Sequence, residues 1–211
     1  MRPLLVGITG GIATGKSTLS RMIQEEGYTV IFSDQIGHEV LLLPEIKLKL
    51  VNEFGSEILT GNRIDREKLR EKAFNNKEKL EKLNQIVHPG ILEAMDDLVI
   101  HSPLDYIFIE IPLLFETQLD ECLDFIVLIY VDQETQIQRL IGRNNFTLEH
   151  AKRIIDSQMS LDKKIQRADL AIENNGTEDD LHCQVWKIIK HLPVIKKKKI
   201  KSFLKTKDHE S

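Results

Sequence analysis

The stretch Gly10-Gly-Ile-Ala-Thr-Gly-Lys-Ser17 decides the fold of this chain. It fits the pattern G-x-x-x-x-G-K-[ST], directly follows the apolar run Leu4–Ile8 and directly precedes the apolar-periodic segment Thr18–Glu26. A strand, a glycine-rich loop and a helix in this order form a phosphate-binding loop, because backbone N–H groups and the positive helix end face phosphate oxygens. The motif therefore predicts a nucleotide site near the start of the chain.

Single positions of this loop have separate predicted roles. Glycines let the backbone fold tightly enough for successive amides to point at phosphate oxygens. Lys16 supplies a mobile positive charge, and the Ser17 hydroxyl is the expected ligand of Mg²⁺. The metal implied by the pattern is Mg²⁺, while the choice of ATP as the nucleotide depends on other residues.

Four further apolar runs follow the first one, separated by segments with helical periodicity. All five runs are short and contain β-branched residues: Leu4–Ile8, Tyr28–Phe32, Tyr106–Ile111, Phe125–Val131 and Leu170–Ile172. This alternation is typical of a parallel sheet covered by helices on both faces. We expect an α/β, P-loop NTPase three-layer fold with a five-stranded parallel sheet.

Residues from about 44 to 103 hold no convincing core strand and are interpreted as a helical insertion. Asp65 is the expected cap of a helix over Arg66–Val87, which His88-Pro89 should end because a residue before proline avoids the helical region. The predicted division is therefore a nucleotide-binding core (1–43, 104–135 and 168–192), a helical insertion (44–103) for which the family resemblance described below implies acceptor binding, a lid region (136–167) and a basic disordered tail (193–211).

Composition narrows the class of protein. The formal net charge of the chain is −4, although residues 196–211 carry seven lysines against Asp208 and Glu210. The rest of the chain is thus acidic and would repel a nucleic-acid backbone. Only two cysteines occur, without metal or redox spacing, and no apolar run is long enough for a signal or membrane segment. We expect a cytoplasmic protein without nucleic-acid or membrane partners, and favour a monomer.

Polar residues that follow the apolar runs should meet at the carboxyl edge of the sheet, where open parallel sheets bind ligands. Asp34 is the best candidate for a general base or for orienting an acceptor hydroxyl, with a helix N-cap as the alternative. Asp132 is better explained as the N-cap of Gln133–Gly142. Glu110 either helps to hold Mg²⁺ or lines the crevice.

Two arginines form a second candidate group. Arg139 and Arg143 are four residues apart on the helix after the fourth run, so both side chains project from one face and can converge on one ligand. Together with Lys152 and Arg153 they surround the loop Asn144–Thr147, which suits a lid that closes over phosphates. The alternative for each arginine is a solvated surface charge.

The phosphate-binding loop alone does not separate kinases from other nucleotide-binding proteins. GTPases usually carry N-K-x-D, whereas the only similar run here is Asn76-Lys77-Glu78-Lys79. A short chain with a helical insertion after its second strand favours a kinase of a small acceptor. A nucleotide-dependent switch with a partner-binding tail is the alternative from another class.

The sequence resembles the dephospho-coenzyme A kinase family from Leu4 to about Leu192. The stretches that carry the resemblance are Thr9–Thr18, Ser33-Asp34, Ile64–Leu69 with Phe74, His88-Pro89, Ile111–Glu116, Gln136–Arg143, Gln158, and Ala168-Asp169 with Asn174. The resemblance implies ATP-dependent phosphorylation of the ribose 3′-hydroxyl of dephospho-coenzyme A. A kinase of another small acceptor, such as a nucleoside monophosphate, is the alternative.

The resemblance also implies site residues. Catalysis would involve Lys16, Asp34 and Arg143, with Asp34 near the acceptor hydroxyl and Arg143 in the lid. ATP would be bound by Gly11, Ala13, Thr14, Gly15, Lys16, Ser17, Thr18, Arg139, Asn174 and Gly176, the last two beside the adenine. The small-molecule acceptor, dephospho-CoA, would be bound by Asp34, Arg66, His88, Pro112, Leu113 and Leu114. His88 has a structural role at a helix end as its alternative.

The chain departs from the family pattern in several places. Ala13 and Thr14 stand where glycine and serine are usual, and Asn144 replaces a common aspartate. Phe32 occupies the first position of what is commonly an Asp-x-Asp pair. We therefore expect this chain to work with Asp34 alone rather than with two carboxylates.

Overall fold

The computed structural model describes residues 2–74, 76–144 and 146–204, without the side chains of Phe74 and Asn144. Asn145 of the predicted lid loop and residues 205–211 of the predicted tail lie outside the described residues. The chain forms two compact units, one of Met1–Phe32 with Ser102–Ser211 and the other of Ser33–His101. The second unit begins at Ser33, whereas the sequence placed the start of the insertion at about residue 44.

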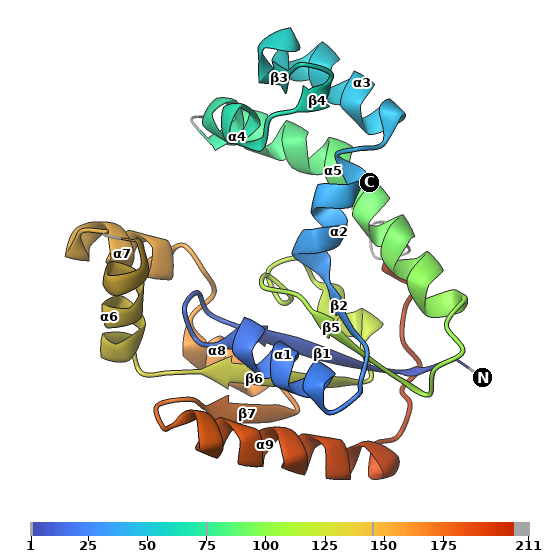
Figure 1. The fold of residues 1–211 in the computed structure, drawn as a ribbon, viewed down its shortest axis with the longest axis vertical. Coiled ribbons are helices and arrows are strands. Elements are labelled where there is room, and N and C mark those ends of the chain that lie inside the picture. Colours follow the sequence, from blue (N-terminus) through green and yellow to red (C-terminus); the bar gives the residue numbers. More distant parts are fainter. Residues whose placement is uncertain (1, 75, 145, 205–211) are drawn as a thin grey trace. The chain divides into compact units, whose positions relative to one another are not determined.

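The first unit is built on a five-stranded parallel sheet with the strand order β2-β5-β1-β6-β7. Its strands are β1 (Leu4–Gly10), β2 (Val30–Phe32), β5 (Tyr106–Glu110), β6 (Phe125–Tyr130) and β7 (Leu170–Glu173) (Figure 1). The central strand β1 is buried along its whole length, as expected for a parallel strand covered on both faces. The predicted α/β fold is confirmed.

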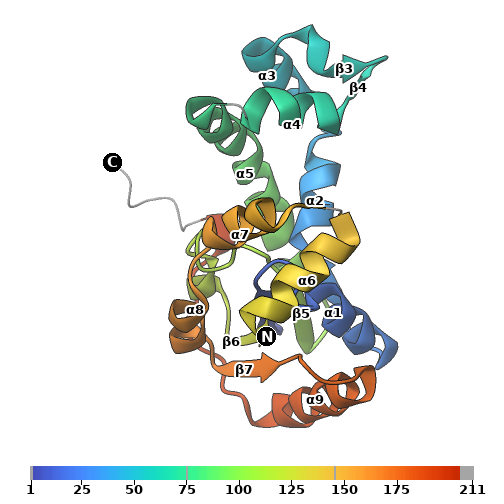
Figure 2. The same cartoon turned by 90° about the vertical axis from the view of Figure 1, so that its left-hand side faces the viewer.

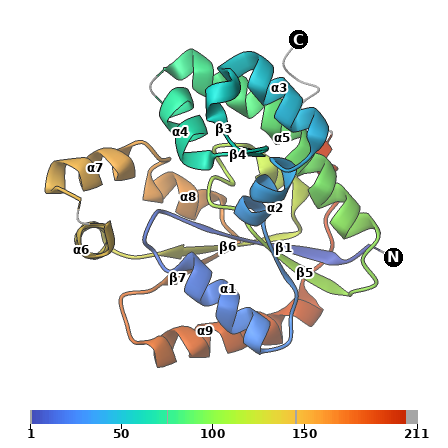
Figure 3. The same cartoon turned by 45° about the horizontal axis from the view of Figure 1, so that its top comes forward.

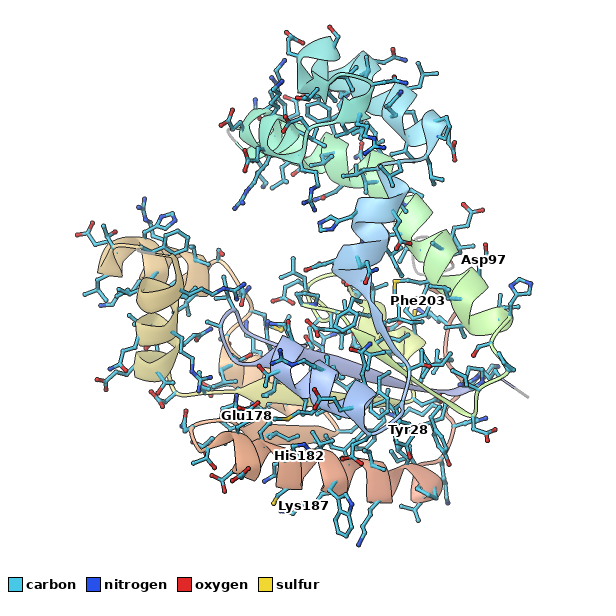
Figure 4. All side chains as sticks on the ribbon, viewed as in Figure 1. Tyr28, Asp97, Glu178, His182, Lys187 and Phe203 are labelled. Carbon is cyan, nitrogen blue, oxygen red and sulfur yellow. The ribbon has the colours of Figure 1, made fainter. Side chains whose placement is uncertain are left out.

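Helices α1 (Lys16–Glu25) and α9 (Glu178–His191) lie together along one face of this sheet, as Figure 1 shows. Each inserts an apolar stripe into the same core: Leu19, Met22 and Ile23 from α1, and Leu181, Val185 and Ile188 from α9. Glu178, His182 and Lys187, labelled in Figure 4, follow the exposed side of α9. Thr177 and Asp180 form a reciprocal cap at the start of α9.

The opposite face of the sheet is covered by shorter elements. Helix α8 (Leu161–Arg167) packs against β6. The segment after β5, which includes the short 3₁₀ turn η2 (Leu119–Cys122), covers the remaining part of this face. Leu114 and Leu123 of this segment lie against Gly7 of β1. A side chain at Gly7 would collide with Leu123, so the absence of a Cβ lets this layer approach β1 closely.

Helices α6 (Gln133–Asn144) and α7 (Leu148–Asp156) cover most of residues 136–167, the region predicted as a lid, and appear one above the other in Figure 2. Asp132 accepts hydrogen bonds from the backbone N–H and the hydroxyl of Thr135, so its predicted capping role is confirmed. Thr147 caps α7 by accepting from the backbone N–H of His150.

The second unit is mainly helical (Figure 3). It consists of α2 (Ser33–Val40), α3 (Pro44–Phe54), the 3₁₀ turn η1 (Ser56–Ile58), the hairpin strands β3 (Leu59–Thr60) and β4 (Arg63–Ile64), α4 (Arg66–Phe74) and α5 (Lys77–Ile100). Helix α5 packs against α2, α3 and α4. The two-residue strands β3 and β4 were not predicted, because so short a hairpin carries no alternating apolar pattern.

One predicted helix of the insertion was wrong in two respects, because the helix breaks within its predicted range and continues beyond its predicted end. The predicted helix Arg66–Val87 is divided between α4 and α5, and Asn76 caps α5 by accepting from the backbone N–H of Glu78. Pro89 lies inside α5 and does not end it. Beyond the proline, α5 still packs against α2, because Gly90 lies next to Val40 and Ile91 lies next to Gly37. The free energy of this packing outweighs the loss of one backbone hydrogen bond at Pro89.

The predicted disordered tail is also wrong for its described part. After the 3₁₀ turn η3 (Leu192–Val194), the chain runs back along the first unit, and Phe203 is only 1% exposed. Figure 4 labels this side chain. The backbone N–H of Lys198 donates to Asp124, and that of Lys201 donates to the carbonyl oxygen of Glu121. The lysine-rich composition concealed these backbone contacts.

Candidate active site

The phosphate-binding loop connects β1 to α1 with two residues in the left-handed region of the backbone. Ala13 has φ 60° and Gly15 has φ 98°. A side chain at Gly15 would collide with the amide of Asn174. Glycine fits its position without strain, whereas Ala13 carries a cost of about 1–2 kcal/mol for a left-handed alanine.

Lys16 folds back across this loop from the first turn of α1. Its Nζ donates to the carbonyl oxygens of Gly10 at 2.9 Å and Gly11 at 2.7 Å. The ammonium group is therefore held at the loop itself, where the positive end of α1 also lies. This concentration of positive charge suits a polyphosphate.

Ser17 and Glu110 meet at the carboxyl end of β5. The Ser17 hydroxyl donates to Glu110 Oε1 at 3.2 Å, and Glu110 is only 6% exposed. The second carboxylate oxygen of Glu110 is buried and has no hydrogen-bond partner among the described residues. A hydroxyl beside an unsatisfied carboxylate oxygen is a donor set that fits Mg²⁺.

This pair is not a complete metal site. In the part of the chain that the structure describes, no group of three or more His, Cys, Asp or Glu side chains is placed to hold a metal ion. Mg²⁺ usually combines one or two carboxylates with substrate phosphates and water. Ser17 and Glu110 thus fit a cation that arrives together with a nucleotide.

Asn174 and Arg139 support the loop from the neighbouring strand and helix. The Asn174 side chain donates to the carbonyl oxygen of Thr14 at 2.9 Å, while its backbone N–H donates to that of Tyr130 at 2.8 Å. Arg139 Nη2 donates to the carbonyl oxygen of Asn174 at 3.0 Å. Both residues were expected as nucleotide ligands. In the structure Asn174 contacts the loop directly, and Arg139 contacts Asn174.

Two glutamines hold the loop at Ile12. Gln136 of α6 donates from Nε2 to the carbonyl oxygen of Ile12 at 2.7 Å. Gln158, which follows α7, accepts from the Ile12 backbone N–H at 3.1 Å. Spacing arguments did not single out either glutamine. The only signal was that both belong to stretches shared with the family that the sequence resembles.

An ion pair between the buried Lys164 and the partly buried Glu116 fixes the residue next to Gln158. Glu116 Oε1 accepts from the backbone N–H of Met159 at 3.0 Å and lies 2.8 Å from Nζ of Lys164, whose side chain is 2% exposed. Burial by itself raises the pKa of Glu116, but hydrogen bonds from Lys164 and Met159 outweigh it and hold the pKa below its usual value. The carboxylate therefore remains ionised and joins the segment after β5 to the end of the lid region.

The other residues predicted in the first unit differ in exposure. Leu113 is 45% exposed, whereas Leu114 is fully buried and packs beside Gly7, so Leu114 is a core residue in this structure. Arg143 lies exposed in the last turn of α6. Gly176 lies against the carboxylate of Asp180, where a side chain would collide.

In the second unit, Asp34 and His38 are one turn apart on α2. Asp34 is exposed in the first turn, inside the helix that begins at Ser33, so the alternative in which Asp34 is the N-cap is wrong. Arg66 Nη1 lies 2.5 Å from Nε2 of His38, a contact that places the start of α4 against α2. His38 was not predicted. His88 lies in the middle of α5, so the alternative of a structural role at a helix end is wrong as well.

Fold and loop together define the class of this chain, a P-loop nucleotide-binding protein of the kinase type. The family model of dephospho-CoA kinase matches residues 4–180, and the chain therefore belongs to the dephospho-CoA kinase family. The helices of the described residues include none that is long and apolar enough to cross a membrane.

Known relatives agree with this assignment. A dephospho-CoA kinase of Fusobacterium nucleatum is 40% identical over 186 residues, covering 88% of this chain and 96% of the relative. The structure of a dephospho-CoA kinase from Campylobacter jejuni is 32% identical with a TM-score of 0.68, covering 89% of this chain and 96% of that one. The structure of TT1252 from Thermus thermophilus is 29% identical with a TM-score of 0.78, covering 91% and 99%.

Proposed function

We propose that this chain transfers the γ-phosphoryl group of ATP to the ribose 3′-hydroxyl of dephospho-CoA, giving coenzyme A and ADP. The observation that carries the proposal is the phosphate-binding loop with Lys16 held across it and Ser17 beside the buried Glu110, in a member of the dephospho-CoA kinase family. We also propose that the enzyme is cytoplasmic, and we favour a monomer.

The nucleotide side of the proposal rests on the loop. Backbone N–H groups from Ala13 to Thr18 bind the phosphates, and Lys16 leaves its carbonyl partners to pair with the transferring group. Ser17 and Glu110 hold Mg²⁺, which neutralises phosphate charge when it is bound. Arg143 contributes positive charge from the lid. Gly11, Thr14, Gly15, Arg139, Asn174 and Gly176 complete the predicted nucleotide site.

On the acceptor side, Asp34 is the proposed general base. The 3′-oxygen of the acceptor attacks the γ-phosphorus, the bond to the β–γ bridging oxygen breaks, and the hydroxyl proton passes to the Asp34 carboxylate. Two residues earlier the chain has Phe32, which pairs in register with Glu110. Because residue 32 is phenylalanine and not aspartate, Asp34 acts without a second carboxylate from this stretch. Further acceptor contacts are proposed for Arg66, His88, Pro112 and Leu113, whereas the buried Leu114 is left out of the site.

A coupled ADP-release assay with ATP and Mg²⁺ tests the proposal against a panel of dephospho-CoA, AMP, dTMP and shikimate. Of the four acceptors, we expect only dephospho-CoA to support ADP release. Its product should carry one additional phosphate on the 3′-oxygen. Lys16→Ala should abolish this release while leaving the unfolding midpoint near that of the parent. Acceptor-independent hydrolysis, or preference for another acceptor, would contradict the proposal.

A further inference from the structure

Ile12 occupies an unusual place in the phosphate-binding loop, because side chains satisfy both polar groups of its backbone. Gln136 Nε2 binds its carbonyl oxygen at 2.7 Å, and Gln158 Oε1 binds its N–H at 3.1 Å. Loop N–H groups are normally left to phosphate oxygens. The Ile12 residue is instead an anchor, directly before Ala13 and its left-handed turn.

The two glutamines come from opposite ends of the helix pair α6–α7, which makes up most of the predicted 136–167 lid region. Gln136 lies in the first turns of α6 and is only 9% exposed, while Gln158 follows the end of α7. The backbone next to Gln158 is itself fixed, since the Met159 N–H donates to Glu116, which pairs with the buried Lys164. Both ends of the α6–α7 pair are therefore joined to the same residue of the loop.

We propose that Gln136 and Gln158 are positioning residues that clamp Ile12, set the phosphate-binding conformation of the loop and couple it to the lid region. This inference rests on the proposed function only in that the ligand of the loop is ATP. A fixed loop binds phosphate without first ordering its backbone, so the clamp acts on nucleotide affinity. The acceptor is not involved, which separates this role from that of Asp34.

An isosteric pair of variants tests the clamp. Gln136→Glu replaces the donor by an oxygen that faces the carbonyl of Ile12, whereas Gln158→Glu keeps an oxygen that can accept from the Ile12 N–H. Both add one negative charge beside the loop. We expect Gln136→Glu to weaken ATP binding by at least about tenfold, the factor for one lost hydrogen bond of ordinary strength, and to weaken it more than Gln158→Glu does.

The measurements are calorimetric ATP binding without acceptor, the KM values for ATP and acceptor, and unfolding midpoints with and without ATP. The KM for dephospho-CoA should stay near that of the parent, and Gln138→Glu, an exposed position on the same helix, should leave ATP binding unchanged. Gln158→Met should weaken binding again, because methionine cannot accept the hydrogen bond.

Two results would overturn the clamp. Equal losses in Gln136→Glu and Gln158→Glu would mean that added charge alone explains the effect. Loss of unfolding midpoint with unchanged ATP affinity would mean that the glutamines only stabilise the fold. If the parent binds ATP but does not phosphorylate dephospho-CoA, the proposed function fails while the clamp is still tested by the binding data.

Discussion

The Ser17 hydroxyl donates a hydrogen bond to Glu110 Oε1 across 3.2 Å and so joins the start of α1 to the end of β5. The other oxygen of this carboxylate is buried without a hydrogen-bond partner among the described residues. An unsatisfied buried carboxylate oxygen is costly unless something binds it in the working protein. This arrangement is the structural reason for assigning Mg²⁺ to this pair.

Glu110→Gln should raise the concentration of Mg²⁺ needed for half-maximal activity by about 10–100-fold, the usual loss when a group supporting a metal is removed. Glutamine keeps the size of the side chain but not its charge. Activity titrated with free Mg²⁺ at saturating ATP measures the effect. Glu173→Gln, at the exposed end of β7, is the matched control and should behave like the parent. An unchanged Mg²⁺ dependence in Glu110→Gln would leave Glu110 as a lining residue.

Arg143→Ala should lower kcat by roughly a hundredfold or more while ATP binding weakens far less, because a lid arginine meets charge that develops during transfer. Arg143 is exposed at the end of α6, so removing it should not disturb the fold. Steady-state kinetics with both substrates varied give the two constants. Arg21→Ala, an exposed arginine of α1 outside the lid region, is the control. Similar kinetics in the two variants would make Arg143 an ordinary surface charge.

Asp34→Asn should reduce kcat by roughly 10²–10⁴, the range usual for a general acid–base group, with little change in the KM for ATP. Asparagine retains the size and hydrogen-bonding reach of aspartate but cannot take the proton. Asp97→Asn, on the exposed side of α5, controls for loss of charge in the same unit. Since Asp34 lies inside α2 and is not its cap, retained turnover would count directly against the catalytic assignment.

The sequence predicted the sheet and the loop well because both depend on local signals. Each strand is a short apolar run, and the loop has fixed spacing between Gly10, Gly15 and Lys16. Contacts that depend on distant residues were missed. Gln136 and Gln158 reach Ile12 from more than a hundred residues away, and the Arg66 contact with His38 joins two helices. No periodic pattern encodes such pairs.

Errors in the prediction arose where tertiary packing overrides a local rule. Pro89 would end an isolated helix, yet α5 continues through it because Gly90 packs against Val40 of α2. The lysine-rich segment after Val194 reads as solvated, yet its backbone binds Asp124 and Glu121, and Phe203 is buried. In both cases the deciding contacts are made by backbone or by glycine, which composition does not reveal.

Ala13→Gly should stabilise the protein by up to about 1.6 kcal/mol, because relief of about 1–2 kcal/mol of left-handed strain exceeds the cost of about 0.4–1 kcal/mol from the greater entropy of the unfolded chain. Thermal unfolding with and without ATP measures the change, and kcat should stay near that of the parent. Ala151→Gly, inside α7 and fully buried, should instead cost about 1 kcal/mol or more. A loss of stability in Ala13→Gly as large as in Ala151→Gly would show that the loop imposes no strain at this position.

Asp124 is the buried carboxylate that joins the two ends of the first unit. Its oxygens accept from Arg2 at 2.5 and 2.8 Å, from the Leu5 N–H at 2.9 Å and from the Lys198 N–H at 2.6 Å. Burial by itself raises the pKa of Asp124, but the hydrogen bonds from Arg2, Leu5 and Lys198 outweigh it and hold the pKa below its usual value.

A carboxylate with a lowered pKa in the folded state makes stability depend on pH in one direction. Its contribution is complete above the unfolded pKa of about 3.9 and is lost as pH falls from there through the lower folded value. Asp124→Asn should therefore cost about 2–4 kcal/mol at neutral pH, as expected for removing the charge from a buried hydrogen-bonded pair, and the difference from the parent should shrink below about pH 4. Urea unfolding at a series of pH values measures both effects.

Asp105→Asn, at an exposed position before β5, should give a small difference without this acid dependence. A stability gap for Asp124→Asn that stays constant down to the acid transition would mean that hydrogen-bond geometry, rather than the charge of Asp124, holds the amino-terminal strand and the lysine-rich segment together.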